Sequence, residues 1–269
     1  MRGNDHEYIL LEKREQIGYI TFNRPEKLNA IRPQDYELFD ELVNDCDKDA
    51  SIRAIIVTGK GRAWTAGDDL NTYPGGSEAP PAPKVPPTDM LLKGQLTKHQ
   101  FTIVRTCLTL LESGTVSIGA VNGVCWLPEI LFAMDFVIAA DVARFAGGDV
   151  RMGLCPGGSS TQILPRLLGR RRAIEFLLLS EEISAEDAYR IGIVNKVVPL
   201  SQLMPEAEAL AKKVIAHPLP GIQLTKMAIT RAQDIPLREG LEVEDWYCRL
   251  SGQTEEFQTF AQRFKAKKI

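Results

Sequence analysis

Two carboxylates stand where the sequence makes an ionised group unfavourable. Glu129 directly follows Pro128 in the mostly apolar stretch NGVCWLPEILFAMD, residues 122–135, and Asp149 follows two glycines. A buried carboxylate without a partner either takes up a proton or does chemistry, because burial disfavours the charged form. We therefore expect burial to raise the pKa of Glu129, as suits a general base near neutral pH. The residues alone leave one alternative, a structural ion pair with an arginine such as Arg151.

Two glycine-containing turns could supply backbone N–H groups to the same chemistry. In GKGRAWTAGDDL, residues 59–70, Gly67 permits close backbone approach, so amides of this turn could point at a ligand oxygen. An ordinary tight turn between strand and helix is the alternative. PGGSST, residues 156–161, resembles a helix start, and a carboxylate facing it could form an acid/base pair with Glu129 and hold a water.

Simpler roles stay open for the residues of this second segment. Asp149 could be a solvated turn residue, and Ser159 or Ser160 an N-cap. No histidine lies near either serine in the sequence, so a Ser-His-Asp triad has little local support.

The elements that must position these residues alternate between strands and helices, which predicts an α/β architecture. Strands are expected at 8–15, 17–25, 53–59, 115–123, 135–141 and 143–153, and helices from about 33, around 104–111 and over most of the chain beyond 201. A capping box at Ser184–Asp187 predicts a further helix that ends at Gly192. The Pro- and Gly-rich segment 73–87 is predicted to be a mobile loop.

Composition narrows the classes of function. The 269 residues carry a net charge of −3, with a pI of about 5.8, which argues against a nucleic-acid binder. Five scattered cysteines and three histidines show no zinc pattern and suggest reduced thiols. The charged start does not resemble a signal peptide, and the apolar runs are too short to span a bilayer. We expect a cytoplasmic protein that does not bind membranes.

Five blocks then occur in the order and spacing of a known family: NRPEKLNAI, GRAWTAGDDL, VNG…PEILFAMDFVIAADVARF, DVRMGLCPGGSSTQILPRLLG and ISAEDAYRIGIVNKVVP. From about Tyr8 to the C-terminus the chain resembles the crotonase (enoyl-CoA hydratase/isomerase) superfamily. The resemblance implies an α/β fold with a crotonase-like ββα spiral core over residues 1–200. It also implies a C-terminal helical trimerisation lobe over residues 201–269, and a homotrimer or a dimer of trimers.

In that family two backbone N–H groups grip the thioester oxygen of an acyl-CoA and stabilise an enolate. The resemblance implies that Thr65 supplies the first donor. The second comes from a glycine-rich turn that CWLP replaces here, which implies Trp126 as the donor, with Leu127 as its alternative. Pro128 is excluded because it has no N–H.

The resemblance also assigns the side chains of the site. Glu129 and Asp149 fall at the two catalytic carboxylates, where hydratases usually have glutamate at the second, and Gly157 falls beside the catalytic water. The coenzyme A edge would comprise Lys27, Leu28, Ala30, Ala63, Ala66, Gly67, Asp68, Asp69 and Leu70. The basic tail Lys265, Lys267 and Lys268 would contact the 3′-phosphate or simply be solvated. Coenzyme A enters as part of the substrate; no permanently bound cofactor and no metal is implied.

Two carboxylates on this scaffold favour the addition of water to a 2-enoyl-CoA. A carbon–carbon hydrolase of cyclic β-diketones shares a similar turn before Glu129, but uses a histidine near Asp149 and tends to lack RPEKLNA. A Δ3-Δ2 enoyl-CoA isomerase, which needs one base, and an inactive scaffold are further alternatives. Trp64, Trp126 and the Pro-rich loop are expected to form the pocket wall, and Trp246 to pack among the C-terminal helices.

Overall fold

A computed structural model describes residues 7–72, 98–126 and 128–266, without the side chains of 98–102, 265 and 266. The predicted loop 73–87, Leu127, Lys267 and Lys268 therefore lie outside the described residues, as does the side chain of Lys265. Within these ranges no helix is long and apolar enough to cross a membrane.

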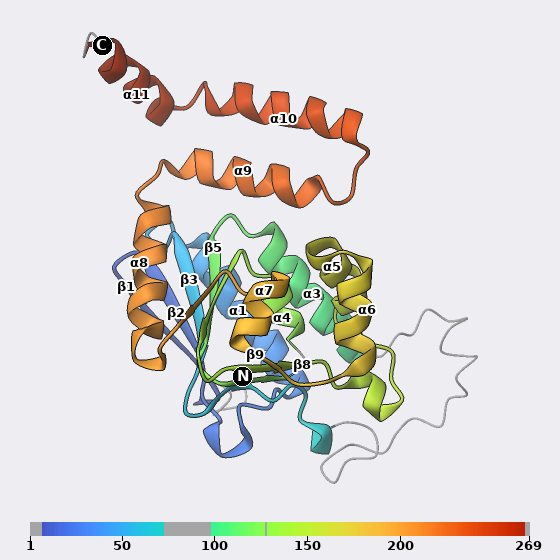
Figure 1. Cartoon of the computed structure of the whole chain (residues 1–269). Helices are drawn as coiled ribbons and strands as arrows, with labels where there is room; N and C mark the ends of the chain where they lie inside the picture. The colour runs from blue at the N-terminus through green and yellow to red at the C-terminus, as the bar shows by residue number, and fades with distance from the viewer. Residues whose placement is uncertain (1–6, 73–97, 127, 267–269) are drawn as a thin grey trace.

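A six-stranded sheet forms the centre of the molecule (Figure 1). Its order is β1-β2-β3-β5-β7-β10, with β1 antiparallel to β2 and the other neighbours parallel. The apolar runs predicted as buried strands, β3 and β5, lie in the middle of it, as expected for parallel strands covered on both faces. The strands are β1 (Ile9–Arg14), β2 (Ile17–Phe22), β3 (Ala54–Gly59), β5 (Val116–Val121), β7 (Phe136–Ala140) and β10 (Lys196–Val198).

A smaller sheet carries the segments that the sequence analysis singled out. Its order is β4-β6-β8-β9, and only β9 runs antiparallel to its neighbour. Strands β4, β6 and β8 each follow a strand of the large sheet within a few residues, so short turns link the two sheets there. The strands are β4 (Ala63–Thr65), β6 (Val124–Trp126), β8 (Arg144–Ala146) and β9 (Ile183–Ser184).

Helices cover both faces of the large sheet. In Figure 1, α8 lies on one side of the large sheet, in contact with β3, β5 and β7, and α1, α3 and α4 lie on the other side. The α-helices are α1 (Pro33–Lys48), α3 (Lys98–Glu112), α4 (Glu129–Phe132), α5 (Ser160–Leu168), α6 (Arg170–Leu179), α7 (Ala185–Ile191), α8 (Leu203–Ile215), α9 (Leu219–Arg231), α10 (Leu237–Ser251) and α11 (Glu255–Ala266). Short 3-10 helices occupy Pro25–Lys27, Leu70–Thr72, Asp149–Met152 and Leu200–Gln202.

The start and end signals of α7 work as predicted. The Ser184 hydroxyl accepts a hydrogen bond from the Asp187 amide at 3.1 Å, and Gly192 ends the helix with φ of 98°. The strand predicted at 143–153 is wrong beyond Ala146. Two glycines, Gly147 and Gly148, follow this residue, and the chain turns into the 3-10 helix that begins at Asp149.

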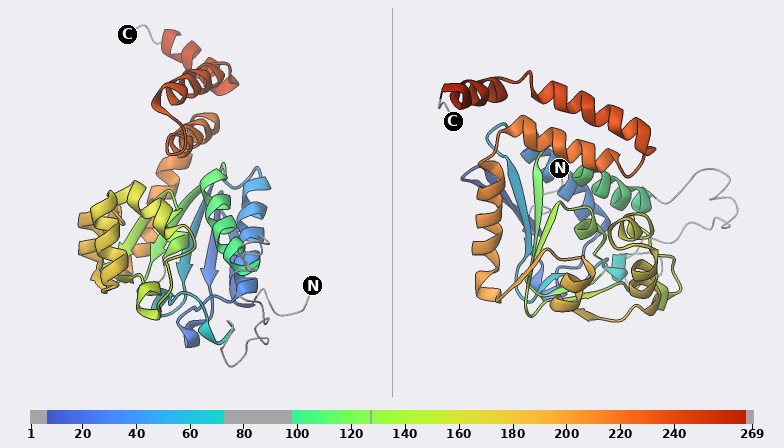
Figure 2. Two further views of the ribbon diagram at one scale, coloured as in Figure 1. Left: turned by 90° about the vertical axis from the view of Figure 1, so that its right-hand side faces the viewer. Right: turned by 45° about the horizontal axis from the view of Figure 1, so that its top comes forward.

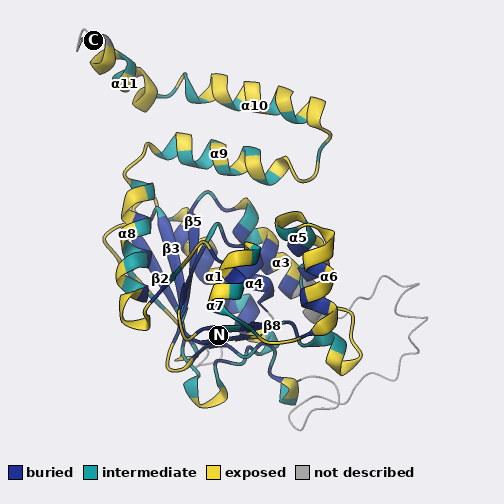
Figure 3. Ribbon diagram, in the orientation of Figure 1, coloured by how far each residue is buried: buried dark blue, intermediate teal, exposed yellow. Residues whose placement is uncertain are grey.

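The C-terminal helices divide into two kinds. Leu203, Ala207 and Ala211 of α8 are buried in the apolar layer against the large sheet, and α9 lies along the core. Helices α10 and α11 extend beyond α9, away from the core (Figures 1 and 2). Figure 3 shows that α10 and α11 are largely exposed, whereas most residues of α9 are of intermediate burial. Trp246, expected to pack, is 62% exposed. The predicted division at residue 200 stays a prediction. Helix α8 lies beyond that boundary and packs on the core.

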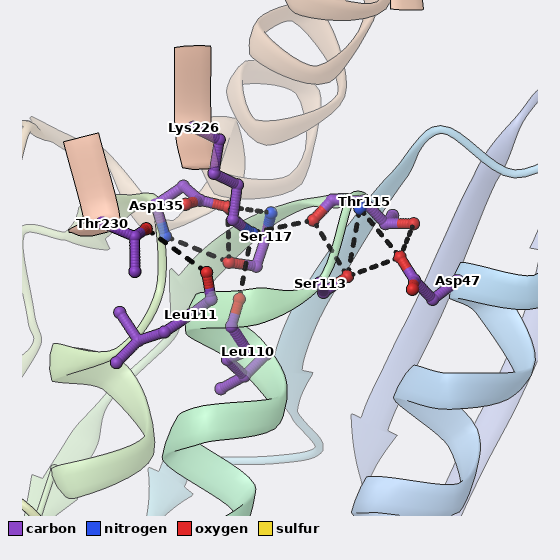
Figure 4. Close-up of polar contacts among 9 residues, drawn as sticks. All are labelled: Asp47, Leu110, Leu111, Ser113, Thr115, Ser117, Asp135, Lys226 and Thr230. Carbon is purple, nitrogen blue, oxygen red and sulfur yellow. Dashed lines mark hydrogen bonds and ion pairs between the residues drawn. The ribbon is translucent and has the colours of Figure 1, made fainter. Parts of the chain in front are cut away.

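One buried cation fastens α9 to the core (Figure 4). Lys226 Nζ donates to the Leu110 and Thr115 carbonyl oxygens, both at 3.0 Å, and to Asp135 Oδ2 at 2.8 Å. Asp135 also accepts from the amide and hydroxyl of Ser117 at 2.8 and 2.9 Å. All three ammonium protons therefore have acceptors, and helix α9 is tied to α3, β5 and the turn that follows α4.

Candidate active site

Glu129 opens helix α4 directly after Pro128 and is only 8% exposed. Ser160, the first residue of α5, donates its hydroxyl to Glu129 Oε1 at 3.1 Å. Burial, followed by the negative charge of Asp149, raises the pKa of Glu129 to about 8. The direction agrees with the sequence-based expectation. Glu129 is therefore largely protonated at pH 7 and can give up a proton near neutral pH.

The alternative role for Glu129, an ion pair with Arg151, is not present. The two residues are both described, and no ion pair joins them. Arg151 is instead exposed on the 3-10 helix that Asp149 begins. Burial with a hydroxyl and no arginine is the environment that retains a proton on a carboxyl group.

Asp149 lies in the same cluster, at the half-buried start of its 3-10 helix. Burial raises the pKa of Asp149 from its ordinary value, and the charge of Asp68 raises it further. Because the charge of Asp149 also acts on Glu129, the two predicted carboxylates do come together, although 20 positions separate them in the sequence. Asp149 is thus the more accessible of two interacting acids.

A third carboxylate belongs to this cluster and was predicted only as part of the coenzyme A edge. Asp68 accepts a hydrogen bond from the hydroxyl of buried Tyr36 at 2.7 Å. Burial, the charge of Asp68 and the charge of Glu129 hold the pKa of the Tyr36 phenol well above its ordinary range. The sequence gives no local signal for this contact, because Tyr36 lies in the first turns of α1, far from residue 68.

Gly158 explains how Glu129 can be so tightly enclosed. Its φ is +54°, and a Cβ atom there would lie 2.6 Å from Glu129 Cγ and 2.5 Å from Ile103 Cγ2. Both the backbone conformation and the space require glycine. The resemblance places Gly157 beside a catalytic water. A Cβ atom added at Gly157 would have no neighbouring atom within 4 Å. Its predicted role stays a prediction, and Gly158 is a site residue that the sequence analysis missed.

Cys107 lies against the turn at Gly158 and Ser159 that encloses Glu129. It is 1% exposed, and its thiol lies 3.2 Å from both the Gly158 carbonyl oxygen and the Ser159 hydroxyl. Burial raises the pKa of this thiol to about 12. The thiol is therefore protonated at neutral pH and holds the turn before α5 rather than acting as a nucleophile.

The two predicted oxyanion donors lie in neighbouring strands. Thr65 ends β4 opposite Cys125 of β6, and Trp126 is the next residue of β6. The Thr65 hydroxyl is engaged within the fold, because it donates to the Asn29 carbonyl at 2.8 Å and accepts from the Gly67 amide at 3.0 Å. The assignment of the Thr65 and Trp126 amides to an oxyanion stays a prediction.

The predicted pocket wall needs one correction. Trp64 is fully buried, packs edge-on against Phe22 at 5.3 Å and donates its indole N–H to the Val57 carbonyl oxygen. It is a core residue and cannot line a pocket. Trp126 is 38% exposed, and its indole donates to Glu182 at 3.2 Å. The Pro-rich loop lies outside the described residues.

The predicted coenzyme A edge does come together in space. The segment 24–31 lies alongside 63–69, where the Ala66 amide donates to the Leu28 carbonyl oxygen and the Ile31 amide to that of Gly67. Leu28 and Asn29 both have positive φ, at 53° and 58°. Lys27, Ala30 and Ala63 belong to these segments, and Leu70 follows them with 56% exposure.

Asp69, also predicted on this edge, has a structural role. It is 4% exposed and pairs with Arg24 at 2.6 Å. Although burial opposes the charge, the hydrogen bonds from Arg24 and Asn71 keep the pKa of Asp69 below its usual value. Such an ion pair fixes the turn and leaves the carboxylate inaccessible to a ligand.

A cavity of about 720 Å³ adjoins the cluster between α3, α5 and α9. Cys107, Gly157, Gly158 and Ser159 form its inner wall, so this wall separates the cavity from Glu129. Apolar side chains such as Leu108, Leu111 and Phe132 line much of the remainder. Among the described residues, no three His, Cys, Asp or Glu side chains are arranged to hold a metal ion.

Known proteins are similar in sequence to this chain over most of its length. The sequence profile of the enoyl-CoA hydratase/isomerase family matches residues 12–269. A 1,2-epoxyphenylacetyl-CoA isomerase of Escherichia coli (strain K12) is 32% identical over 97% of both chains. A short-chain-enoyl-CoA hydratase of Clostridium acetobutylicum is 31% identical over 88% of this chain and 86% of its own.

Solved structures confirm the predicted α/β crotonase fold. An enoyl-CoA hydratase subunit I structure from Geobacillus kaustophilus superposes with a TM-score of 0.84 at 29% identity, covering 97% of this chain and 96% of that one. An enoyl-CoA hydratase from Bacillus anthracis gives a TM-score of 0.83 at 26% identity, with the same coverage. The chain therefore belongs to the enoyl-CoA hydratase/isomerase, or crotonase, family of enzymes.

Proposed function

We propose that this enzyme adds water to a 2-enoyl-CoA thioester. The observation that carries the proposal is the pair of interacting carboxyl groups, one of which, Glu129, has a pKa of about 8 and the other of which, Asp149, is more accessible. An acid and a base that titrate apart can serve the two proton transfers of a hydration. Several relatives are named enoyl-CoA hydratases, which supports the same reaction class.

The proposed mechanism uses the groups in distinct roles. Asp149 takes a proton from a water molecule while the water oxygen forms a bond to the β-carbon. The electrons of the double bond then move into a thioester enolate. Backbone amides near Thr65 and Trp126 stabilise the enolate oxygen. Glu129 then delivers its proton to the α-carbon, and the proton on Asp149 returns through solvent to reset the pair. Coenzyme A is carried by the substrate, with its adenine and pantetheine along the edge formed by 24–31 and 63–70.

The cavity of about 720 Å³ between α3, α5 and α9 is not assigned to the acyl chain. The wall formed by Cys107, Gly158 and Ser159 separates it from Glu129, which the acyl carbons must approach.

Isomerisation is the second candidate, because the E. coli relative is named an isomerase. A shift of a double bond needs one group that removes and returns a proton, and Glu129 alone could do this. The carbon–carbon hydrolase has weaker support, since Asp149 and Val150 stand where a histidine would be needed. An inactive scaffold is the outcome if no thioester reacts.

We also propose that the subunits self-associate through the extended C-terminal helices. Leu237, Leu241, Trp246, Phe260 and Phe264 are each at least 55% exposed in the single chain. Exposed apolar surfaces of this kind mark protein–protein contacts. A homotrimer or a dimer of trimers, as the resemblance implies, would cover them, and sedimentation measurements test this. A cytoplasmic location stays a prediction.

The deciding experiment incubates the protein with crotonyl-CoA and follows the enoyl absorbance and the product mass. The proposal expects the gain of one water with the thioester intact, and it expects Glu129→Gln and Asp149→Asn each to slow that gain by about 10²–10⁴. A double-bond shift without change of mass would support the isomerase instead. Water gain at the wild-type rate in both variants would refute the assigned carboxylates.

A further inference from the structure

Lys226 belongs to helix α9, yet its ammonium group is buried against the core (Figure 4). Its side chain is only 8% exposed, and its three acceptors are the Leu110 and Thr115 carbonyl oxygens and Asp135 Oδ2. A buried ammonium group is unfavourable unless its protons are paired, as all three are here. The cation therefore has a defined position, and it holds three segments of the core around itself.

The first of these segments is helix α3, which Lys226 contacts at its C-terminal end. Leu110 lies in the last turn of α3, where a carbonyl oxygen has no partner within the helix and where the helix dipole favours a cation. One turn earlier, the Cys107 thiol lies 3.6 Å from the Glu129 carbonyl oxygen and 3.2 Å from that of Gly158. Helix α3 thus connects the ammonium group with the residues that enclose the reacting acid.

The second connection runs through the turn after α4. Glu129 is the first residue of α4, and Asp135 follows it six positions later. Asp135 accepts from Lys226 and from the Ser117 amide and hydroxyl, and its own amide donates to the Ser117 hydroxyl at 3.0 Å. The turn is therefore fixed to both α9 and β5. Lys226 holds α3 and the α4 segment at one point, and Glu129 lies where these two elements meet.

We propose that Lys226 is a positioning residue for Glu129: the cation supplied by helix α9 fixes α3 and the turn after α4 relative to each other, and so keeps Glu129 shielded from water. This inference rests on the proposed role of Glu129 as the proton donor. Without Lys226 the two elements lose their common anchor, and water gains access to the Glu129 carboxyl group. The alternative is that the ion pair stabilises the fold and has no effect on the acid.

The direction of a pKa change separates positioning from simple loss of charge. The titratable groups that interact with Glu129 stay in place in the test; they are Asp68, Asp149, Tyr36, Cys107 and Cys125. Burial is the largest cause of the raised pKa of Glu129, so entry of water should lower that pKa from about 8. Removal of a positive charge acts in the opposite direction, because a cation favours the ionised carboxylate. A lowered pKa therefore identifies loss of enclosure.

The test uses Lys226→Met and the double variant Lys226→Met/Asp135→Asn, which leaves no charge unpaired. In both, the pH at which the rate of crotonyl-CoA hydration falls should be lower than in the wild type by about one pH unit. At about pH 6, where Glu129 is still protonated, kcat should fall about 10-fold through misplacement of the acid, while KM stays within about twofold.

Thr230→Val is the matched control on the same helix. It removes another hydrogen bond between α9 and α3, in which the Thr230 hydroxyl donates to the Leu111 carbonyl oxygen at 3.3 Å, but it leaves the ammonium group and its three acceptors in place. We expect neither kcat nor the pH of the fall in rate to change in this variant.

A purely structural role gives a different result. The double variant would then recover kcat together with its stability, and its rate would still fall at about pH 8. That result, or a fall in rate at higher pH in either variant, would overturn the inference. Should Lys226→Met not fold, as judged by circular dichroism, the double variant decides.

Failure of the proposed function is distinguishable. If the wild type turns over no thioester, hydration is refuted, and the inference is tested without substrate. The infrared carbonyl band of protonated Glu129, identified by its loss in Glu129→Gln, then reports the pKa of this group in each variant. A lower pKa in both Lys226 variants and an unchanged one in Thr230→Val support the positioning role. A pKa that stays at about 8 in the double variant refutes it.

Discussion

Two carboxylates six residues apart, Glu129 and Asp135, show how differently one short segment treats its charges. Asp135 receives the ammonium of Lys226 and two donors from Ser117. Glu129 is more deeply buried and receives the hydroxyl of Ser160, and its pKa is raised to about 8. Asp135, which stabilises the fold, is paired with a cation, whereas Glu129, which is suited to proton transfer, receives a neutral hydroxyl and keeps a raised pKa.

The largest expected effect concerns the carboxylate without a cation. Glu129→Gln removes the proton donor but keeps the shape and the Ser160 contact, so kcat should fall by about 10²–10⁴. The free energy of unfolding should stay equal or rise, since no acid then has to be buried. Turnover of crotonyl-CoA and urea unfolding measure the two quantities. If Glu129→Gln keeps the wild-type kcat, or if it lowers the free energy of unfolding as much as the loss of an ion pair does, Glu129 would not differ in role from Asp135.

The opposite pattern is expected at the ion pair. Lys226→Met leaves Asp135 partly buried without its cation and should lower the free energy of unfolding by about 3 kcal/mol, because breaking a buried pair strands the remaining charge. Urea denaturation measures the loss. Adding Asp135→Asn should restore part of it, as no charge is then stranded. Lys212→Met, which breaks an exposed pair with Glu15, is the control and should lower the free energy of unfolding far less than Lys226→Met does.

The glycines before α5 sharpen the comparison, since they enclose Glu129. Gly158→Ala places a methyl group 2.6 Å from Glu129 Cγ in a left-handed backbone, which should lower the unfolding free energy by about 1–3 kcal/mol and displace Glu129. Gly157→Ala meets open space and should change the unfolding free energy by less than about 0.5 kcal/mol. Equal effects of the two substitutions would show that the enclosure of Glu129 does not depend on Gly158.

The smallest effect is a limb of the pH profile. Because burial raises the pKa of Glu129 to about 8, the protonated acid is present below that pH and is lost above it. The rate of hydration should therefore fall as pH rises through about 8, approaching tenfold per pH unit well above it. Tyr36→Phe removes a neutral hydroxyl and should leave the pH of this fall in rate unchanged. Asp149→Asn removes the negative charge that raises the pKa of Glu129, so the fall in its residual rate should occur at lower pH. A rate that stays constant to pH 10 would contradict a protonated Glu129.

Much of this arrangement is predictable from local sequence. The apolar residues around Glu129 predict its burial, the apolar runs predict β3 and β5, and Ser184 and Gly192 mark the ends of α7. Each of these follows from neighbours within a few positions, where periodicity and capping act.

The residues that were missed depend on contacts between distant segments. Ser160 reaches Glu129 across 31 positions, and Tyr36 reaches Asp68 across 32. Trp64 was misjudged for the same reason, because its partner Phe22 lies on another strand. Only the packed fold brings such pairs together, so propensities and spacing carry no information about them.

The paired left-handed residues Leu28 and Asn29 have a consequence for how a ligand would arrive. The Asn29 amide group donates to the carbonyl oxygens of Ala63 and Lys60 and accepts from the Arg24 amide at 2.8 Å, which pins this bend from three sides. Any molecule that docks along the bend meets a backbone already in its final shape. Binding there carries no free-energy cost for ordering this part of the chain. The bend is preorganised, so a ligand does not have to induce its conformation.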